Sequence, residues 1–242
     1  MTLPLKRRVE KSLGRLFDPL YLIYLLVDDL RSWRYFSKWF LSFCASRSLI
    51  DEAKPWIPFE AANWLHHYLT RNMKVFEWGS GGSTIFFAER VEEVVTIEHD
   101  KNWYALVSKA LAQRGITNCS YQLHEPKPIA GSLATIDESQ SSGFIYDDYY
   151  VGTTVHQYVR AIDVHTDHTF DLVLVDGRSR TECIKHAIPK IKFDGYLMLD
   201  NSNNADVAEI VRKLQSYPHT VFRGIAPGWP PTRWANTIWK IS

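Results

Sequence analysis

The chain has little cysteine, almost no net charge and no long apolar run. Its three cysteines, Cys44, Cys119 and Cys183, are widely spaced and odd in number, so they match neither a zinc-binding pattern nor a disulfide framework. This usage is typical of a reducing cytoplasm. We expect each cysteine to behave as a small buried apolar residue.

The near-zero net charge argues against a nucleic-acid-binding protein, and the lack of a long apolar run argues against a membrane-spanning one. The formal net charge is +1, from 28 basic and 27 acidic residues, so no nucleic-acid partner is expected. The apolar run Leu20 to Val27 is eight residues long and is followed by Asp28 and Asp29. It is too short to span a bilayer, and no secretory signal is recognisable. The chain of 242 residues is long enough for one α/β domain plus an extension, in the cytoplasm.

The most informative stretch is a glycine-rich turn between a predicted strand and a predicted helix. Met73 to Phe76 is strand-like, Glu77-Trp78-Gly79-Ser80-Gly81-Gly82-Ser83-Thr84 follows, and a helix-like run extends to Arg90. This order of elements builds the nucleotide cradle of doubly wound α/β domains. Gly79 and Gly81 would let a cofactor approach the backbone without a Cβ atom in the way.

The residues around the turn distinguish two nucleotide cofactors. Thr84 holds the place of the third glycine in the dinucleotide fingerprint, which weakens the case for a pyrophosphate. Glu77 would also repel a pyrophosphate, whereas it suits the ammonium group of S-adenosylmethionine. Glu98 ends the β-branched run Val94 to Ile97, nineteen residues after Gly79, and a carboxylate there can accept the ribose hydroxyls of either cofactor. An NAD(P)-dependent oxidoreductase is therefore an alternative.

On these residues the sequence resembles the class I S-adenosylmethionine-dependent methyltransferases, from about Pro55 to the C-terminus. Glu77 to Gly81 matches their first motif, and Glu98 matches their ribose-binding acidic residue. The resemblance implies a doubly wound α/β fold with a mostly parallel seven-stranded sheet, an antiparallel C-terminal strand and S-adenosylmethionine as cofactor. The implied cofactor-binding residues are Glu77, Gly79, Ser80, Gly81, Ser83, Thr84, Glu98, His99 and Glu125, with His124 also near the adenine.

Two later strands also end in acidic residues. Phe170 to Val175 and Gly195 to Leu199 are nearly continuous apolar runs, as expected of central parallel strands, and Asp176 and Asp200 follow them. Ligands of open α/β sheets bind at the carboxyl ends of the strands. These two aspartates, with Glu77 and Glu98, therefore predict a functional rim.

A metal site is one interpretation of part of this rim. Asp176, Asp200 and Asn201 are hard oxygen donors suited to Mg²⁺ or Ca²⁺, and they resemble the ligands of the catechol-type, metal-dependent O-methyltransferases. The chain departs from that family at Ser179, which replaces the lysine base. The other interpretation is that Asp200-Asn201 caps the next helix.

The predicted reaction is methylation of a small-molecule or saccharide hydroxyl, since the glycine motif is most similar to a bacterial branch of small-molecule or glycan methyltransferases. Transfer requires alignment of the reacting atoms and a general base. Asp176 is the first candidate for the base and His156 the second. Arginine does not act as a base, but it can bind an acidic group of the acceptor. The candidate acceptor contacts are Tyr149, Tyr150, Arg178 and Arg180.

The chain divides into an arm, residues 1–50, and a methyltransferase domain, residues 51–242. The arm has nine basic and four acidic residues, and aromatic residues at positions 36, 39, 40 and 43 have helical spacing. It is expected to pack on the domain or on another subunit of a homo-oligomer, or else to lie on an anionic membrane. The insertion 126–168 interrupts the βα alternation and is interpreted as a substrate lid.

Two further functions agree less well with the sequence than a methyltransferase does. A catalytically silent scaffold that docks through its arm is disfavoured by the intact glycine motif. Nucleic-acid methylation is disfavoured because Asp176-Gly177-Arg178-Ser179 lacks both the Asn/Asp-Pro-Pro-Tyr/Phe signature and a cysteine.

The remaining elements follow from periodicity. Helices are expected at 61–69, at 101–114 with Leu106, Ala110 and Leu111 on one face, and at 155–162, 181–191 and 205–214. Strands are expected at 120–123, 220–225 and 237–241.

Overall fold

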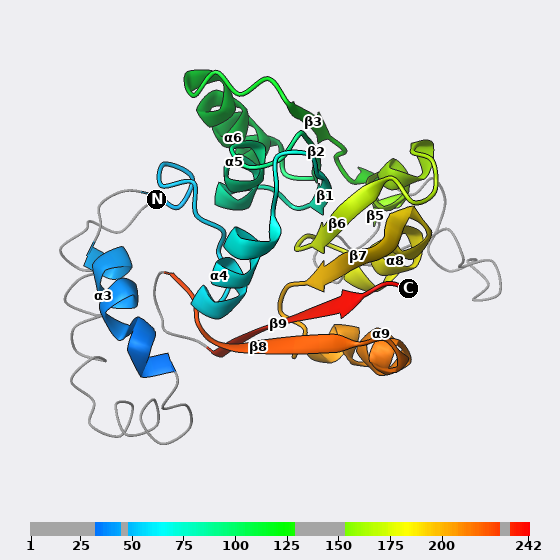
Figure 1. The fold of residues 1–242 in the computed structure, drawn as a ribbon. Coiled ribbons are helices and arrows are strands. Elements are labelled where there is room, and N and C mark those ends of the chain that lie inside the picture. Colours follow the sequence, from blue (N-terminus) through cyan, green and yellow to red (C-terminus); the bar gives the residue numbers. More distant parts are fainter. Residues whose placement is uncertain (1–31, 45–47, 129–152, 228–232) are drawn as a thin grey trace.

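The fold comes from a computed structural model, which describes residues 32–44, 48–128, 153–227 and 233–242 (Figure 1). Its main sheet has seven strands in the order β3-β2-β1-β6-β7-β9-β8. Their bounds are β1 (Lys74–Trp78), β2 (Glu93–Glu98), β3 (Cys119–Leu123), β6 (Phe170–Val175), β7 (Ile191–Leu199), β8 (His219–Ile225) and β9 (Arg233–Lys240). Only β9 runs against the other strands of this sheet. The predicted sheet, with its antiparallel C-terminal strand, is confirmed.

The order of the strands reverses between β1 and β6. From β1 the chain moves outward through β2 and β3, then returns to pair β6 with the other side of β1. Open α/β sheets bind ligands at such a switch point, outside the carboxyl ends of the strands. The glycine turn after β1 and Asp176 after β6 meet there.

Helices cover both faces of the sheet. One face packs on α4 (Phe59–Tyr68) and α5 (Gly82–Ala88), and α6 (Lys101–Gln113) joins them through Val107 and Leu111. The opposite face packs on α7 (His156–Val159), α8 (Arg180–Ala187) and α9 (Ala208–Lys213). In β6, Leu172 and Leu174 enter the first core and Val173 and Val175 the second, as expected of a strand buried on both faces.

Several element boundaries differ from the sequence-based expectation. The expected helix 155–162 is α7 followed by the 3-10 helix η4 (Arg160–Val164), and 181–191 is α8 followed by η5 (Ile188–Lys190), which contains Pro189. The stretch 205–214 begins as η6 (Ala205–Val207), and η7 (Leu214–Ser216) follows α9. Leu106 is 55% exposed, because the buried stripe of α6 runs through Val107 and Leu111 instead. Cys183 is buried as expected, and Cys119 is partly exposed.

Part of the arm is described. Its elements are η1 (Ser32–Tyr35) and α3 (Phe36–Cys44). Tyr35 stacks on Phe59 of α4 with ring centroids 5.7 Å apart, and Arg34 pairs with Glu60. These contacts attach η1 to the main domain. Among the described residues, no helix has the length and apolarity to cross a membrane.

The insertion is described at its two ends. β4 (Lys127–Pro128) and β5 (Thr153–Thr154) pair as a small antiparallel sheet. Tyr149 and Tyr150, the two predicted acceptor contacts in the insertion, lie outside the described residues.

Candidate functional site

The glycine turn touches the backbone that follows β6. Gly79 has a φ angle of +84°, and a Cβ atom on it would lie 3.0 Å from the carbonyl carbon and oxygen of Asp176 and from the nitrogen of Gly177. Its own N–H donates to Ile97 O at 2.9 Å. Both the backbone angle and this close approach therefore require glycine.

Glu77 is connected to the glycine turn through the Thr84 hydroxyl. Its side chain is fully buried near the end of β1, and its Oε2 atom accepts hydrogen bonds from Thr84 Oγ1 (2.7 Å) and Thr96 Oγ1 (2.9 Å). Thr84 Oγ1 in turn accepts from Gly81 N at 3.1 Å. Burial raises the pKa of Glu77 to about 7, although the nearby hydroxyls, including that of Ser83, oppose the shift. Its Oε1 atom has no hydrogen-bond partner among the described residues.

Glu98 ties the end of β2 to the glycine turn. Its Oε2 atom accepts from the nitrogen (3.0 Å) and hydroxyl (2.6 Å) of Ser80, and its Oε1 atom from the nitrogens of His99 (2.7 Å) and Asp100 (2.9 Å). His99 Nδ1 also lies 2.8 Å from Oε1. Burial opposes ionisation, but these hydrogen bonds outweigh it and lower the pKa of Glu98 below its ordinary value.

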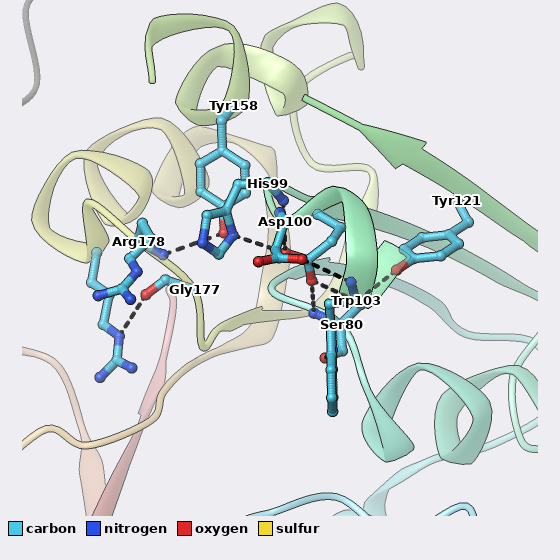
Figure 2. A network of polar contacts seen from close by, with 10 residues as sticks. Ser80, His99, Asp100, Trp103, Tyr121, Tyr158, Gly177 and Arg178 are labelled. Carbon is cyan, nitrogen blue, oxygen red and sulfur yellow. Dashed lines mark hydrogen bonds and ion pairs between the residues drawn. The ribbon is translucent and has the colours of Figure 1, made fainter. Parts of the chain in front are cut away.

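Two aromatic residues that sequence analysis did not single out complete this network (Figure 2). Trp103 Nε1 donates to Ser80 O at 2.6 Å, and the Tyr121 hydroxyl lies 2.7 Å from Ser80 Oγ. Asp100 caps α6 by accepting from Trp103 N at 2.8 Å, which places the indole beside the turn. This Asp-x-x-Trp cap was the local signal for Trp103. Tyr121 had none, because its contact depends on the pairing of β2 with β3.

The residues after β3 lie farther from this network. His124 N donates to Glu98 O at 2.7 Å, so His124 is fixed to the end of β2. Burial lowers the pKa of the half-buried His124 ring. Glu125 is exposed, and its predicted cofactor contact stays a prediction.

Asp176 and Asp200 lie side by side after β6 and β7. Burial raises the pKa of both carboxyls, and the Asp200 charge raises that of Asp176 further. The Arg180 guanidinium lies among them. Its Nη1 atom donates to Asp200 O at 2.8 Å, and its Nη2 atom lies 3.5 Å from Asn201 Oδ1 and 3.8 Å from Asp176 Oδ1.

This arrangement does not fit the predicted Mg²⁺ site well. Mg²⁺ needs oxygen ligands with octahedral geometry. Here the Arg180 guanidinium donates to the main-chain oxygen of Asp200 and lies 3.5 Å from Asn201 Oδ1 and 3.8 Å from Asp176 Oδ1, so a cation already faces the candidate ligands. We therefore derive no step through a metal.

The insertion is anchored at this site by Tyr158 of α7. Trp78 Nε1 donates to Tyr158 O at 2.9 Å, and Arg178 N donates to the Tyr158 hydroxyl at 3.4 Å. A Cβ atom on Gly177 would overlap that hydroxyl. His156, the second candidate base, begins the same helix and is half-buried. Arg178 is also half-buried, and its predicted role toward the acceptor stays a prediction.

Comparison with known proteins supports the fold. No protein-family model matches the chain, and no curated protein matches its sequence. The O-methyltransferase TomG from Streptomyces achromogenes, in complex with S-adenosylmethionine, aligns over 88% of this chain and 100% of its own, with 14% identity and a TM-score of 0.57. An rRNA methylase from Streptococcus thermophilus aligns over 76% and 95%, with 14% identity and a TM-score of 0.52. The chain thus has the Rossmann-like fold of these methyltransferases.

Proposed function

We propose that the chain is an S-adenosylmethionine-dependent methyltransferase that acts on a hydroxyl of a small molecule or a saccharide. The observation that carries the proposal is the negative character of the glycine turn. Glu77 lies beneath it with Oε1 unpartnered among the described residues, and Glu98 lies at its side. A cofactor with a positively charged amino-acid tail and a ribose suits these two carboxylates.

The first turn of α5 also argues against a dinucleotide. A pyrophosphate binds the free N–H groups at the start of the helix that follows the glycine turn. In this protein, a Cβ atom on Gly82, the first residue of α5, would overlap the main-chain oxygens of Leu49 and Lys54. Carbonyl oxygens at this position repel phosphate. The NAD(P)-dependent alternative is therefore less well supported.

The chain's own residues supply binding and proton transfer. Glu77 and the turn would hold the ammonium group, and Glu98 the ribose. The bound cofactor supplies a methyl group already activated on a sulfonium. The glycine turn would hold that methyl group in line with the acceptor oxygen, and Asp176 would accept the proton that the acceptor hydroxyl loses. Its raised pKa makes Asp176 a stronger base than an ordinary carboxylate.

A small acceptor is proposed rather than nucleic acid. The net charge of +1 offers little attraction for a phosphate backbone. Glu98, whose pKa is lowered, adds negative charge at the site itself.

Calorimetric titration with S-adenosylhomocysteine tests the proposal. We expect the wild-type chain to bind it, and Glu98→Ala to weaken binding by roughly ten- to a hundredfold, because hydrogen bonds to a charged group are lost. Glu93→Ala is the matched control, since Glu93 begins the same strand and its half-exposed carboxylate pairs only with Lys74 among the described residues. Unchanged affinity in Glu98→Ala would remove the site assignment. Preferential binding of NAD(P) would replace the proposal by the oxidoreductase.

A further inference from the structure

A row of polar side chains extends from the glycine turn across the ends of three strands. Asp176 follows β6, and its backbone contacts Gly79. Val175, Leu199 and Thr237 are paired across β6, β7 and β9. Asp176 and Asp200 each follow their paired residue, and Asn236 precedes Thr237 because β9 is antiparallel. These three residues therefore lie at one level of the sheet. Side chains alternate along a strand, and these three fall on the face that packs on α4 and α5.

Asn236 is the member of this row whose buried amide group has no evident structural role. Its side chain is fully buried within β9, yet neither amide atom has a hydrogen-bond partner among the described residues. The amide faces the Asp200 carboxyl: burial raises the pKa of Asp200, and the polar interaction with the Asn236 side chain opposes part of that rise. Asp200 Oδ1 also lacks a partner in the described part of the chain. Buried polar atoms without partners are costly, and two such neighbours indicate a ligand with hydrogen-bonding groups.

Two tryptophans stand at the outer end of the row. β9 extends beyond the carboxyl end of β7 toward α4 (Figure 1), and Trp234 lies there on the same face as Asn236. The Trp56 ring contacts the Trp234 ring, with centroids 5.6 Å apart and planes tilted by 43°. Trp56 is 50% exposed, although Pro55, Ile57 and Pro58 around it are buried. The buried segment therefore holds the half-exposed Trp56 indole against the Trp234 ring.

We propose that the acceptor of the methyl transfer is a saccharide, whose ring rests on Trp56 and Trp234 and whose hydroxyls bind Asp200 and Asn236. The inference rests on the proposed function. The methylated hydroxyl would lie at the inner end of the row, next to Asp176.

The chemistry of the row favours a saccharide over the other small acceptors. A hydroxyl both donates and accepts hydrogen bonds, and a carboxylate beside an amide offers partners for both. The tilted tryptophans contact each other, so they present one open apolar surface rather than a slot for a flat aromatic ring. Such a surface suits the apolar face of a sugar ring.

Two competing acceptor types fit less well. A catechol bound through a metal would compete with the Arg180 guanidinium, which lies 3.5 Å from Asn201 Oδ1 and 3.8 Å from Asp176 Oδ1. A phosphorylated acceptor would bring further negative charge beside the Asp176 and Asp200 carboxyls, whose ionisation burial already disfavours.

The length of the row sets the size of the acceptor. Neighbouring strands lie about 4.8 Å apart, so Asp176 and Asn236 are separated by roughly 10 Å. Trp234 lies a further two residues along β9. This span exceeds a single sugar ring, so a disaccharide unit should bind better than a monosaccharide.

Saturation-transfer NMR on the full chain, saturated with S-adenosylhomocysteine, tests this inference. The probes are the methyl glycosides of glucose, galactose, mannose and rhamnose, the disaccharides maltose and lactose, and catechol and glucose phosphate as competing classes. We expect transfer to at least one neutral saccharide, with affinity then measured by tryptophan fluorescence. Trp56→Ala and Asn236→Leu, which keeps the side-chain volume, should each weaken that affinity about tenfold.

The controls separate this inference from the proposed function. Phe193→Ala removes a different exposed aromatic ring, which is 71% exposed and stacks on His168 near the amino end of β7. This variant should bind the saccharide with the affinity of the wild type. Affinity for S-adenosylhomocysteine should stay within about twofold in all variants. If S-adenosylhomocysteine binds but no saccharide does, or if catechol or glucose phosphate binds instead, the inference fails alone. It also fails if Trp56→Ala and Asn236→Leu bind the saccharide as the wild type does. If S-adenosylhomocysteine itself does not bind, the proposed function fails.

Discussion

At the scale of single residues, Glu77 makes stability depend on pH. Its pKa is about 7 in the folded protein against 4.5 in the unfolded chain. Between these values the folded state keeps a proton that the unfolded state releases. Stability should therefore fall as pH rises from 4.5 to 7, by about 3 kcal/mol in total.

Glu77→Gln should remove this dependence. Without cofactor, the variant should melt at a higher temperature than the wild type above pH 7 and gain little below pH 4.5. Thermal unfolding over a series of pH values measures the difference, with Glu93→Gln at the half-exposed start of β2 as control. Parallel profiles for wild type and Glu77→Gln would contradict the assignment.

The Arg180 guanidinium leads to a prediction about metal. Millimolar Mg²⁺ should leave the melting temperature of the wild type unchanged, because the Arg180 cation lies 3.5 Å from Asn201 Oδ1 and 3.8 Å from Asp176 Oδ1 and would repel a second cation. Arg180→Ala should destabilise the fold by about 2 kcal/mol, since buried charge-assisted hydrogen bonds are lost. Arg160→Ala, which removes an exposed pair with Asp163, is the control. A rise in melting temperature with Mg²⁺ would restore the metal hypothesis.

Single site residues were predictable where their signal was local. Gly79 and Glu98 were found because the motif and its spacing lie within one strand–turn–helix–strand segment. Asn236 and Tyr121 were missed, since each meets the site only through strand pairing that residue spacing does not encode. The role of Arg180 among the carboxylates was also missed, because it depends on the path of the loop after β6.

At the scale of elements, the anchoring of α7 can be tested at Gly177. Gly177→Ala should force the Tyr158 hydroxyl away from Arg178 N and destabilise the protein by roughly 2 to 3 kcal/mol. Gly115→Ala is a matched control, because Gly115 has a φ angle of +64° and open space for a Cβ atom, so only the backbone cost of about 1 kcal/mol applies. Denaturant unfolding compares the two. An equal loss in both variants would show that Tyr158 can move freely.

Elements were predicted best where burial is complete. The runs that became β6 and β2 are apolar because both faces of these strands are covered, and their carboxyl ends were placed within one residue. Helix limits were less accurate. Pro189 ends the regular part of the helix early, and only packing against α5 selects Val107 rather than Leu106 for the core of α6.

At the scale of the whole molecule, the arm is expected either to pack on the protein or to lie on an anionic membrane. Trp39 is 1% exposed and Tyr35 stacks on Phe59, so these aromatic rings are committed to contacts within the chain. The full chain should therefore not sediment with anionic vesicles at physiological salt. A chain without residues 1–47 serves as the comparison. Sedimentation of the full chain alone would instead establish a membrane-binding arm.

The contact at Gly79 has a consequence for how such a protein diversifies. Two main-chain segments touch there with no side chain between them. The main-chain positions of the glycine turn and of Asp176 are therefore fixed relative to each other, and a side chain at position 79 would push them apart. If the proposed methyl transfer takes place there, new specificities would have to arise farther along the row, at Trp56 and Trp234.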